Sequence, residues 1–215
     1  MSQISKKLTI LDCTLRDGGY YGDWNFNQSL VEKYLSAVSD AKIDIIEIGF
    51  RFLSEGDGLG PFAYSKDDYL TTLPLPKKIS IAVMINASEI IEYCDGADKA
   101  IDLLFSEKSK SPIDIVRIAT HIRDFGKCQH FANKLQTLGY RVFLNLMQID
   151  SIEIDKVALT AKRVSSWGCI DVLYFADSFG SMNDTSIREV IEAISNEWHG
   201  EIGIHAHNNK GHALT

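Results

Sequence analysis

The chain has 215 residues, of which 45% are hydrophobic and 24% are charged, with 15 glycines and 4 prolines. This composition is typical of a folded globular protein and excludes a disordered or collagen-like chain. Acidic residues outnumber Lys and Arg by 29 to 22, a net charge of -7, so we expect neither nucleic acid nor a membrane surface as a partner. No apolar run approaches the roughly 18 residues that a membrane span needs, and the N-terminus lacks the pattern of a signal peptide.

Short β-branched runs alternate with longer helical patterns along the chain. Several of the short runs are almost continuously apolar, as expected for parallel strands that are covered on both faces. In chain order, the sequence predicts a strand at Leu8–Cys13, a helix at Gln28–Ala41, a strand at Ile43–Phe50, a strand at Ile79–Ile85, a helix at Ser88–Ser106, a strand at Ile113–Ile118, a helix at Ile122–Leu138, a strand at Arg141–Leu146, a helix at Ile152–Trp167, a strand at Asp171–Ala176, a helix at Asp184–Trp198 and a strand at Glu201–Ala206.

Local signals support several of these boundaries. Asn27 is a residue type that caps helix N-termini, and Gly139 and Gly168 stand where helices should end. The segment Leu53–Pro76 is rich in Gly and Asp and has no clean period, which predicts a loop with at most a short helix. Its three closely spaced glycines are followed by Pro61 and not by a predicted helix. They therefore indicate a loop and not a phosphate-binding turn.

Seven strands that alternate with helices predict an α/β fold with right-handed crossovers. Two layouts compete, an open doubly wound sheet and a (β/α)8 TIM barrel. No GxGxxG motif follows the first strand, as a dinucleotide-binding doubly wound domain would require. In a barrel, chemistry collects where strands end, and polar residues here do follow the predicted strands. We therefore expect a TIM barrel of residues 1–215 with about seven β/α units.

The sharpest local motif is HAHNN, at the end of the seventh predicted strand. Side chains at positions i and i+2 of a strand point to the same side, so His205 and His207 project together. Two imidazoles on one face are a suitable pair of metal ligands. The alternative is a pair of histidines bonded to water or backbone, and HxH alone would favour that reading.

A second motif, DCTLRDGGY, follows the first predicted strand and places Arg16 and Asp17 there. In an eight-stranded barrel, strands one and seven are separated by a single strand, so their ends lie about 10 Å apart. This is close enough for Asp17 and the two histidines to share one ion. The two motifs together predict a metal site with the ligands Asp17, His205 and His207.

LDCTLRDGG and HAHNN, in this order and with this number of β/α units between them, resemble the motifs of the metal-dependent aldolase/lyase superfamily. That superfamily includes hydroxymethylglutaryl-CoA lyase, the isopropylmalate and homocitrate synthases and, most similar in motif, 4-hydroxy-2-oxovalerate aldolase. The resemblance implies a TIM barrel, a divalent ion held by Asp17, His205 and His207, and Arg16 facing the negative charge that develops in the reaction. It spans the chain from Leu8 to about Gly211.

The expected activity is that of a carbon–carbon lyase, aldolase-like, which cleaves or forms a bond next to the carbonyl of a 2-oxo acid, with pyruvate as substrate or product. Two imidazoles and one carboxylate leave coordination positions open for the oxygens of such an acid. Arg16 carries a permanent charge and a planar fork that suit an enolate or a carboxylate. We expect Mn or Mg as the metal, with Zn or Co as alternatives, because mixed N and O ligands suit all four.

The sequence departs from the aldolase pattern at one position. The resemblance implies a catalytic base His three residues after the metal-binding Asp, where this chain has Tyr20. Tyrosine has an ordinary pKa near 10 and is a poor base at neutral pH unless a nearby charge withdraws its proton. We expect Arg16, Tyr20 and His121 as the catalytic residues, or else a substrate that differs from that of the aldolases. His121, just after the fourth predicted strand, is the substitute that we favour for the catalytic role, and His212 is a weaker candidate.

Further polar residues are expected to line the substrate pocket. Glu47 alternates with Gly49 and Arg51, so the three should face the same way, and a buried Glu47 would need a partner such as Arg51 or Arg117. The expected substrate-binding residues are Glu47, Arg51, Arg117, Asn145 and Asn209.

Two other functions remain open. A Claisen-type synthase would condense an acyl-CoA with a 2-oxo acid, and a non-catalytic metal-binding barrel would serve as an assembly subunit; the missing base His favours the latter. We expect a small-molecule 2-oxo acid as the ligand and a homo-oligomer as the assembly. The four cysteines stand far apart without a CxxC pair, which predicts reduced thiols and a cytoplasmic location.

The length is the last observation. Seven strands are accounted for, and the chain stops at GHALT, inside the expected helix after strand seven. We therefore expect the barrel to be truncated before strand eight, as the N-terminal part of a longer protein, with two open strand edges.

Overall fold

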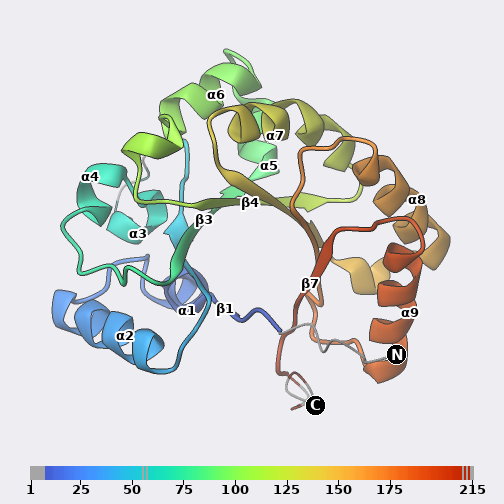
Figure 1. Ribbon diagram of the computed structural model, residues 1–215, viewed down its shortest axis with the longest axis horizontal. Helices are drawn as coiled ribbons and strands as arrows, with labels where there is room; N and C mark the ends of the chain where they lie inside the picture. Colours follow the sequence, from blue (N-terminus) through green and yellow to red (C-terminus); the bar gives the residue numbers. More distant parts are fainter. Residues whose placement is uncertain (1–7, 55, 57, 210, 212, 214–215) are drawn as a thin grey trace. The chain divides into compact units, whose positions relative to one another are not determined.

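The computed structural model describes residues 8–54, 56, 58–209, 211 and 213. The chain divides into two compact units, the first of residues 1–84 and 110–115 and the second of residues 85–109 and 116–215. Both units alternate strands with helices, and Figure 1 shows their elements in chain order. None of the helices in the described ranges is long and apolar enough to cross a membrane.

The first unit begins with the short strand β1 (Leu11–Asp12), the helical turn α1 (Thr14–Gly18) and the helix α2 (Gln28–Asp40). The fully buried strand β2 (Ile45–Phe50) follows and pairs in parallel with β1 and with β3 (Ser80–Asn86). The predicted cap is confirmed, because the side chain of Asn27 accepts a hydrogen bond from the backbone N–H of Ser29 at 2.9 Å.

The segment predicted as a loop between β2 and β3 holds two short helices, α3 (Pro61–Tyr64) and α4 (Asp67–Leu70), where at most one was expected. Pro61 occupies the first turn of α3, a position where its missing N–H costs no hydrogen bond. The charged first turn of α4, Asp67 and Asp68, suits a helix N-terminus.

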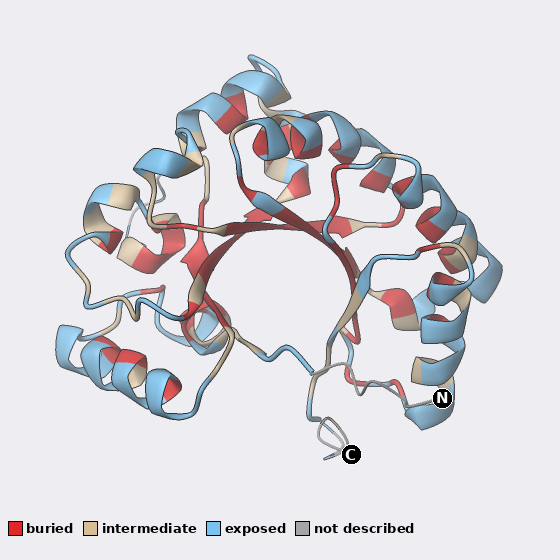
Figure 2. Cartoon of the chain, in the orientation of Figure 1, coloured by how far each residue is buried: buried red, intermediate tan, exposed pale blue. Residues whose placement is uncertain are grey.

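The second unit holds most of β4 (Ile115–His121) and the strands β5 (Arg141–Met147), β6 (Val172–Ala176) and β7 (Glu201–His205). The pairs β5–β6 and β6–β7 are parallel. The helices α7 (Cys128–Thr137), α8 (Ile154–Ser165) and α9 (Asp184–Ser195) alternate with these strands, and Figure 2 shows each with buried residues on one face. This is the one-sided burial of helices that pack on a sheet.

Two predicted helices are interrupted. The pattern over Ser88–Ser106 forms α5 (Ala87–Glu92) and α6 (Ala97–Leu104), because the chain is extended at Tyr93 and Gly96 adopts a φ of 90°. The pattern over Ile122–Leu138 begins as a 3-10 turn at Phe125–Lys127 and becomes α-helical only in α7. Gly139 and Gly168 have φ values of 95° and 69°, which confirms them as helix-ending residues.

All seven predicted strands are confirmed within the described residues, and they form one sheet in the order β1-β2-β3-β4-β5-β6-β7. A doubly wound sheet reverses its strand order at a switch point, whereas a TIM barrel places its strands in chain order. The order without a reversal therefore excludes the doubly wound alternative. The fold is α/β, of the TIM-barrel type, with seven parallel strands, of which β1 to β6 are each followed by a helix within the described residues; truncation before an eighth strand stays a prediction.

Candidate functional site

Arg16 and Asp17 lie on α1, directly after β1. The turn into α1 is held by Asp12, whose carboxylate accepts hydrogen bonds from the backbone N–H of Thr14 at 2.9 Å and from its hydroxyl at 3.1 Å. Asp12 also accepts a hydrogen bond from Tyr34 on α2 at 2.5 Å. These bonds fix the conformation of the segment that presents Arg16 and Asp17.

Arg16 is buried and held between two carboxylates. Its Nε donates to Glu47 Oε1 at 2.7 Å, and one terminal nitrogen donates to Asp17 Oδ1 at 2.6 Å. Glu47 is fully buried, whereas Asp17 is partly exposed. Burial by itself lowers the pKa of Arg16, but the charges of Glu47, Cys13 and Asp17 and the hydrogen bond to Glu47 together outweigh it, and the pKa is raised overall. Arg16 therefore stays protonated, and its two carboxylate partners hold the guanidinium in one orientation.

The indole of Trp24 supports Arg16 from the other side. Its Nε1 donates to the backbone carbonyl of Arg16 at 2.8 Å, and its ring packs edge-on against Phe50 at 5.6 Å. A Cβ on Gly19 would lie 1.9 Å from the Trp24 ring, so only glycine allows this packing. The second glycine of the DGG run thus has a structural role that the sequence did not reveal.

Tyr20, the residue expected in place of a base, lies in the same aromatic cluster. Its ring packs edge-on against Trp24 at 4.9 Å, and 61% of the residue is exposed. Partial burial raises the pKa of Tyr20, the positive charge of Arg16 counteracts this, and the net shift is upward. Tyr20 therefore stays protonated at neutral pH and is suited to donate a proton, not to accept one.

Of the three residues expected to face the same way, Gly49 and Arg51 both approach Ser65, whereas Glu47 contacts Arg16. The register between β2 and β3 shifts between Glu47 and Gly49, which interrupts the alternation of side chains. A Cβ on Gly49 would lie 2.4 Å from the hydroxyl of Ser65, so Gly49 faces the α3 side, while Glu47 contacts Arg16. Arg16 is a partner of Glu47 that the sequence did not suggest.

Arg51 has a different carboxylate partner in the first unit. It forms an ion pair with Asp67 of α4, and Ser111 donates to the same Asp67 oxygen at 2.7 Å. The Nε of Arg51 donates to the backbone carbonyl of Ser65 at 3.2 Å. These contacts give Arg51 a role in fixing the segment after β2.

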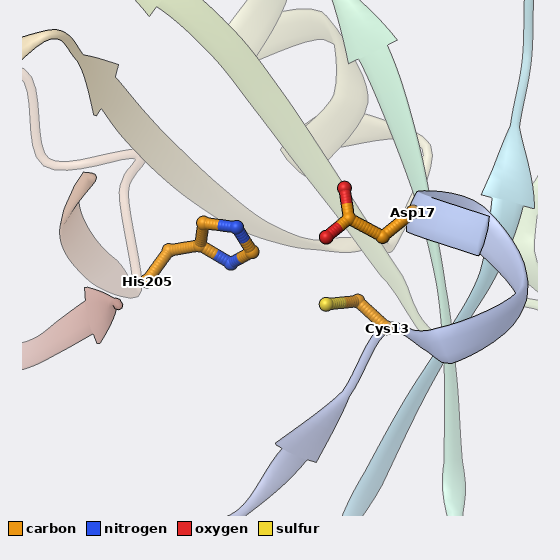
Figure 3. A group of neighbouring side chains, drawn as sticks. All are labelled: Cys13, Asp17 and His205. Carbon is orange, nitrogen blue, oxygen red and sulfur yellow. The ribbon is translucent and has the colours of Figure 1, made fainter. Parts of the chain in front are cut away.

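Cys13 was not expected at the site. It lies between β1 and α1, and its Sγ is within 4.8 Å of a carboxylate oxygen of Asp17. Figure 3 shows the side chains of Cys13 and Asp17 extending from this segment. A soft thiol beside a carboxylate would add a ligand type that favours Zn or Co. Its position in DCTLRD, four residues before Asp17, was the signal that could have revealed it.

In the second unit, His205 and His207 lie together as predicted. Their Nε2 atoms are 3.3 Å apart, and their rings pack edge to face with centroids at 5.0 Å. The Nδ1 of His207 lies 3.2 Å from the backbone carbonyl oxygen of Ser178. A carbonyl only accepts hydrogen bonds, so Nδ1 carries the proton of this contact, and the ring turns its Nε2 toward His205.

This pair fits a metal ion. Two imidazole nitrogens that each lie about 2.1 Å from one ion are about 3.0 Å apart at a right angle and about 3.4 Å apart at a tetrahedral angle. The observed 3.3 Å falls between these values. The carbonyl of Ser178 orients His207 as outer partners commonly orient metal-binding histidines.

The loop after β6 holds Ser178 in place. Its hydroxyl accepts a hydrogen bond from the backbone N–H of Gln148 at 2.9 Å. The carboxylate of the buried Asp177 accepts from the backbone N–H of Ser181 at 2.9 Å. Asn209 lies against this loop, because a Cβ on Gly180 would be 2.6 Å from its Cγ.

Arg117 and Asn145, two of the expected substrate-binding residues, lie together. Arg117 is fully buried on β4 and donates to Asn145 Oδ1 at 3.0 Å. Its guanidinium also lies over the ring of Tyr174, 4.4 Å from the centroid. Tyr174, a polar residue inside the apolar run of β6, was missed by the sequence reasoning. His121 ends β4 and is partly exposed, whereas His212 lies outside the described residues.

The comparisons with known proteins agree with these motifs. The HMGL-like family model matches residues 108–215. A 4-hydroxy-2-oxovalerate aldolase from Carboxydothermus hydrogenoformans is 31% identical over 98% of this chain and 60% of its own length. One from Pelotomaculum thermopropionicum is 28% identical over 97% of this chain and 59% of its own length. The chain thus spans about 60% of the curated relatives that it matches.

Solved structures support the same fold. The N-terminal domain of a candidate aldolase from Bacteroides vulgatus has a TM-score of 0.78 and 28% identity, covering 94% of this chain and 65% of that one. The carboxyl transferase domain of Rhizobium etli pyruvate carboxylase, solved with pyruvate, has a TM-score of 0.74 at 12% identity, covering 97% of this chain and 37% of that one. The second similarity shows the fold alone. The family model, the relatives and the site motifs agree, and the chain belongs to the HMGL-like family of the metal-dependent aldolase/lyase superfamily.

Proposed function

We propose that this chain holds a divalent metal ion through Asp17, His205 and His207 and takes part in aldolase-type cleavage or formation of a carbon–carbon bond next to the carbonyl of a 2-oxo acid. The observation that carries the proposal is the convergence of the two histidine Nε2 atoms at 3.3 Å, with the tautomer of His207 set by a backbone carbonyl. The relatives named 4-hydroxy-2-oxovalerate aldolase support this reaction class.

The proposed metal is Mn or Mg, with Zn or Co as alternatives that Cys13 would favour. When bound, the ion would supply Lewis-acid polarisation of a 2-oxo acid through its carbonyl and carboxylate oxygens. The histidines are neutral donors and Asp17 is an anionic one, so this ligand set partly neutralises a divalent charge. Such a set suits an ion that must also attract an anionic substrate.

Arg16 would stabilise the negative charge that develops on the substrate. In the cleavage direction, the substrate hydroxyl loses its proton, the adjacent carbon–carbon bond breaks and an aldehyde leaves. The electron pair of that bond stays with the 2-oxo acid fragment as an enolate, which takes up a proton on carbon to give pyruvate. The buried contact with Glu47 holds the Arg16 guanidinium in one orientation before the reaction begins, so no reorganisation is needed as charge develops.

Two residues are proposed to move protons. Tyr20, whose raised pKa keeps its hydroxyl protonated at neutral pH, is proposed as a proton donor, for example to the enolate carbon. His121, at the end of β4, is proposed as the group that accepts the proton of the substrate hydroxyl. Arg117, Asn145 and Asn209 are proposed to contact the substrate.

Glu47 and Arg51 are proposed to act indirectly, which revises their expected role as substrate contacts. Glu47 orients Arg16, and Arg51 fixes the segment after β2 through Asp67. We further propose a cytoplasmic location, in keeping with the free cysteines, and a homo-oligomeric assembly.

Calorimetric titration of the intact protein with Mn²⁺ or Mg²⁺ tests the metal site. We expect one site, abolished by His207→Ala and by Asp17→Asn and retained in His199→Ala, which removes an exposed histidine elsewhere. Absence of binding to the unmodified protein, or equal loss in the His199 variant, would contradict the proposal.

Pyruvate release from a panel of 4-hydroxy-2-oxo acids tests the reaction. Arg16→Ala should keep metal binding and lose turnover, and a fully active variant would remove Arg16 from the mechanism. Thiol release from acetyl-CoA with a 2-oxo acid would instead support the synthase. Metal binding without turnover on any substrate would support the non-catalytic barrel.

A further inference from the structure

The second unit contains a cavity that none of the site residues named above lines. It has a volume of about 510 Å³ and is lined by residues of α8 and of the connection that leads from β4 into α7. This volume falls within the range of small-molecule sites, about 300–1,000 Å³. We refer to it as the α8 pocket.

Four cationic side chains line the α8 pocket. Arg123 and Lys127 come from the connection after β4, while Lys156 and Arg163 come from α8. Within α8, the positions of Lys156, Leu159, Thr160 and Arg163 follow the spacing i, i+3, i+4 and i+7, which places them on one face. Lys156 and Arg163 are two turns apart, about 10 Å along the helix axis. The positive charge therefore extends along the length of the pocket.

Little negative charge opposes these four cations. Asp124 accepts from Lys127 at 3.1 Å and from Arg123 at 3.2 Å, and these hydrogen bonds lower its pKa. Among the residues that the structure describes, Lys156 and Arg163 form no ion pair with a carboxylate. Counting Asp124, the local charge is thus about three positive, in a chain whose net charge is -7. Such a reversal of sign in a concave site attracts small anions.

The apolar part of the pocket wall is well ordered. Phe125 is buried, stacks on Trp167 with centroids 5.8 Å apart and is covered by the guanidinium of Arg163 at 4.8 Å. This cation–π contact limits the freedom of Arg163 and holds its charge at the pocket. Leu159 adds an exposed apolar surface to the same wall.

We propose that the α8 pocket binds a small organic phosphate, whose phosphate groups contact Arg123, Lys127, Lys156 and Arg163 and whose organic part packs against Leu159. Arginine forks and lysine ammonium groups are the side chains that bind phosphate oxygens best. A carboxylate would leave most of the positive charge unmatched, because it carries one negative charge where a phosphate carries up to two. An extended polyanion is disfavoured, because the charge lies in a pocket on an otherwise acidic chain.

Titration of the intact chain with ADP tests the site, in a phosphate-free buffer without added metal. Calorimetry should show saturable binding that weakens as salt is raised, and adenosine should not bind. The variants Lys156→Gln and Arg163→Gln should each weaken ADP binding by about tenfold, the effect of losing one charge-assisted contact. The matched control is Lys162→Gln, which removes a lysine of the same helix that pairs with Glu197 outside the pocket.

Trp167 provides a local readout. ADP should change the tryptophan emission of the unmodified protein, and Trp167→Phe should abolish that change while retaining calorimetric binding. If Arg163→Gln unfolds the protein, Lys156→Gln still decides the question, because it lies two turns away from the Phe125 contact. The proposal is wrong if ADP does not bind below about 1 mM, or if Lys162→Gln weakens binding as much as Lys156→Gln does.

Discussion

Replacement of Glu47 by glutamine tests the account of Arg16 most directly. Both side chains of this ion pair are buried, with exposed fractions of 6% for Arg16 and 0% for Glu47, and the two nitrogen and oxygen atoms are 2.7 Å apart. Removal of one partner from a buried pair leaves the other charge without compensation and costs about 3–5 kcal/mol. Asp17 still contacts Arg16 at 2.6 Å, and the glutamine oxygen can still accept a hydrogen bond. We therefore expect the lower end, about 3 kcal/mol of unfolding free energy.

For a chain of this size, such a loss lowers the melting temperature by about 6–12 °C. Thermal and urea unfolding followed by circular dichroism measure it. Because the pKa of Arg16 is raised, the cation persists throughout the accessible pH range, and the loss should be no smaller at about pH 9 than at about pH 7. The matched control is Glu201→Gln, whose pair with Arg141 spans 3.8 Å and is exposed.

The control should cost less than about 0.5 kcal/mol, as exposed ion pairs do. If Glu47→Gln destabilised the protein no more than Glu201→Gln, the buried pair would not be holding Arg16, and the orientation argued for this residue would have to be abandoned.

Three further predictions follow from local contacts. Asn27→Ala removes the N-terminal cap of α2 and should lower the unfolding free energy by about 1 kcal/mol in urea titrations; an unchanged midpoint would contradict the capping role. Gly19→Ala places a Cβ 1.9 Å from the Trp24 ring and should cost about 1–3 kcal/mol with an altered tryptophan emission, whereas Gly22→Ala meets no atom within 4 Å and should change neither. Burial raises the pKa of Cys128 to about 12, so the thiol stays neutral in the folded protein. Its contribution to stability is full below the unfolded pKa of about 8.5 and is lost as the pH rises toward 12. Mass spectrometry should therefore find it unalkylated by iodoacetamide at about pH 8 until urea unfolds the chain, and rapid labelling of the folded protein would refute this.

The sequence was sufficient for the order and type of the strands, because each is a short apolar run with a clear boundary. It was less informative about helix continuity. The apolar pattern over Ser88–Ser106 continues past Gly96, and nothing in that pattern shows that the chain is extended at Tyr93. Such a break depends on how the two short helices pack against their neighbours, which periodicity does not record.

Pairings between distant residues were the least predictable part of the site. His205 and His207 are two positions apart on one strand, so their proximity follows from strand geometry. The partner of Glu47 does not, because the shift in register after this residue changes which side chains can meet it. The α8 pocket shows the same limit, since its four cations come from two separate segments and form no basic run in the sequence.

The Nδ1 of His207 contacts the main chain of Ser178 and not its side chain. The group that accepts the Nδ1 proton is a peptide oxygen, which every residue type provides. Replacement of the Ser178 side chain would therefore keep the acceptor group itself and remove only the hydroxyl that accepts from the backbone N–H of Gln148. The path of the main chain from Asp177 to Ser181, by contrast, determines where the carbonyl of Ser178 lies, and the bond from Ser181 N–H to Asp177 holds this turn. An insertion or deletion in that turn would alter the proton position of a histidine 29 residues further along the chain.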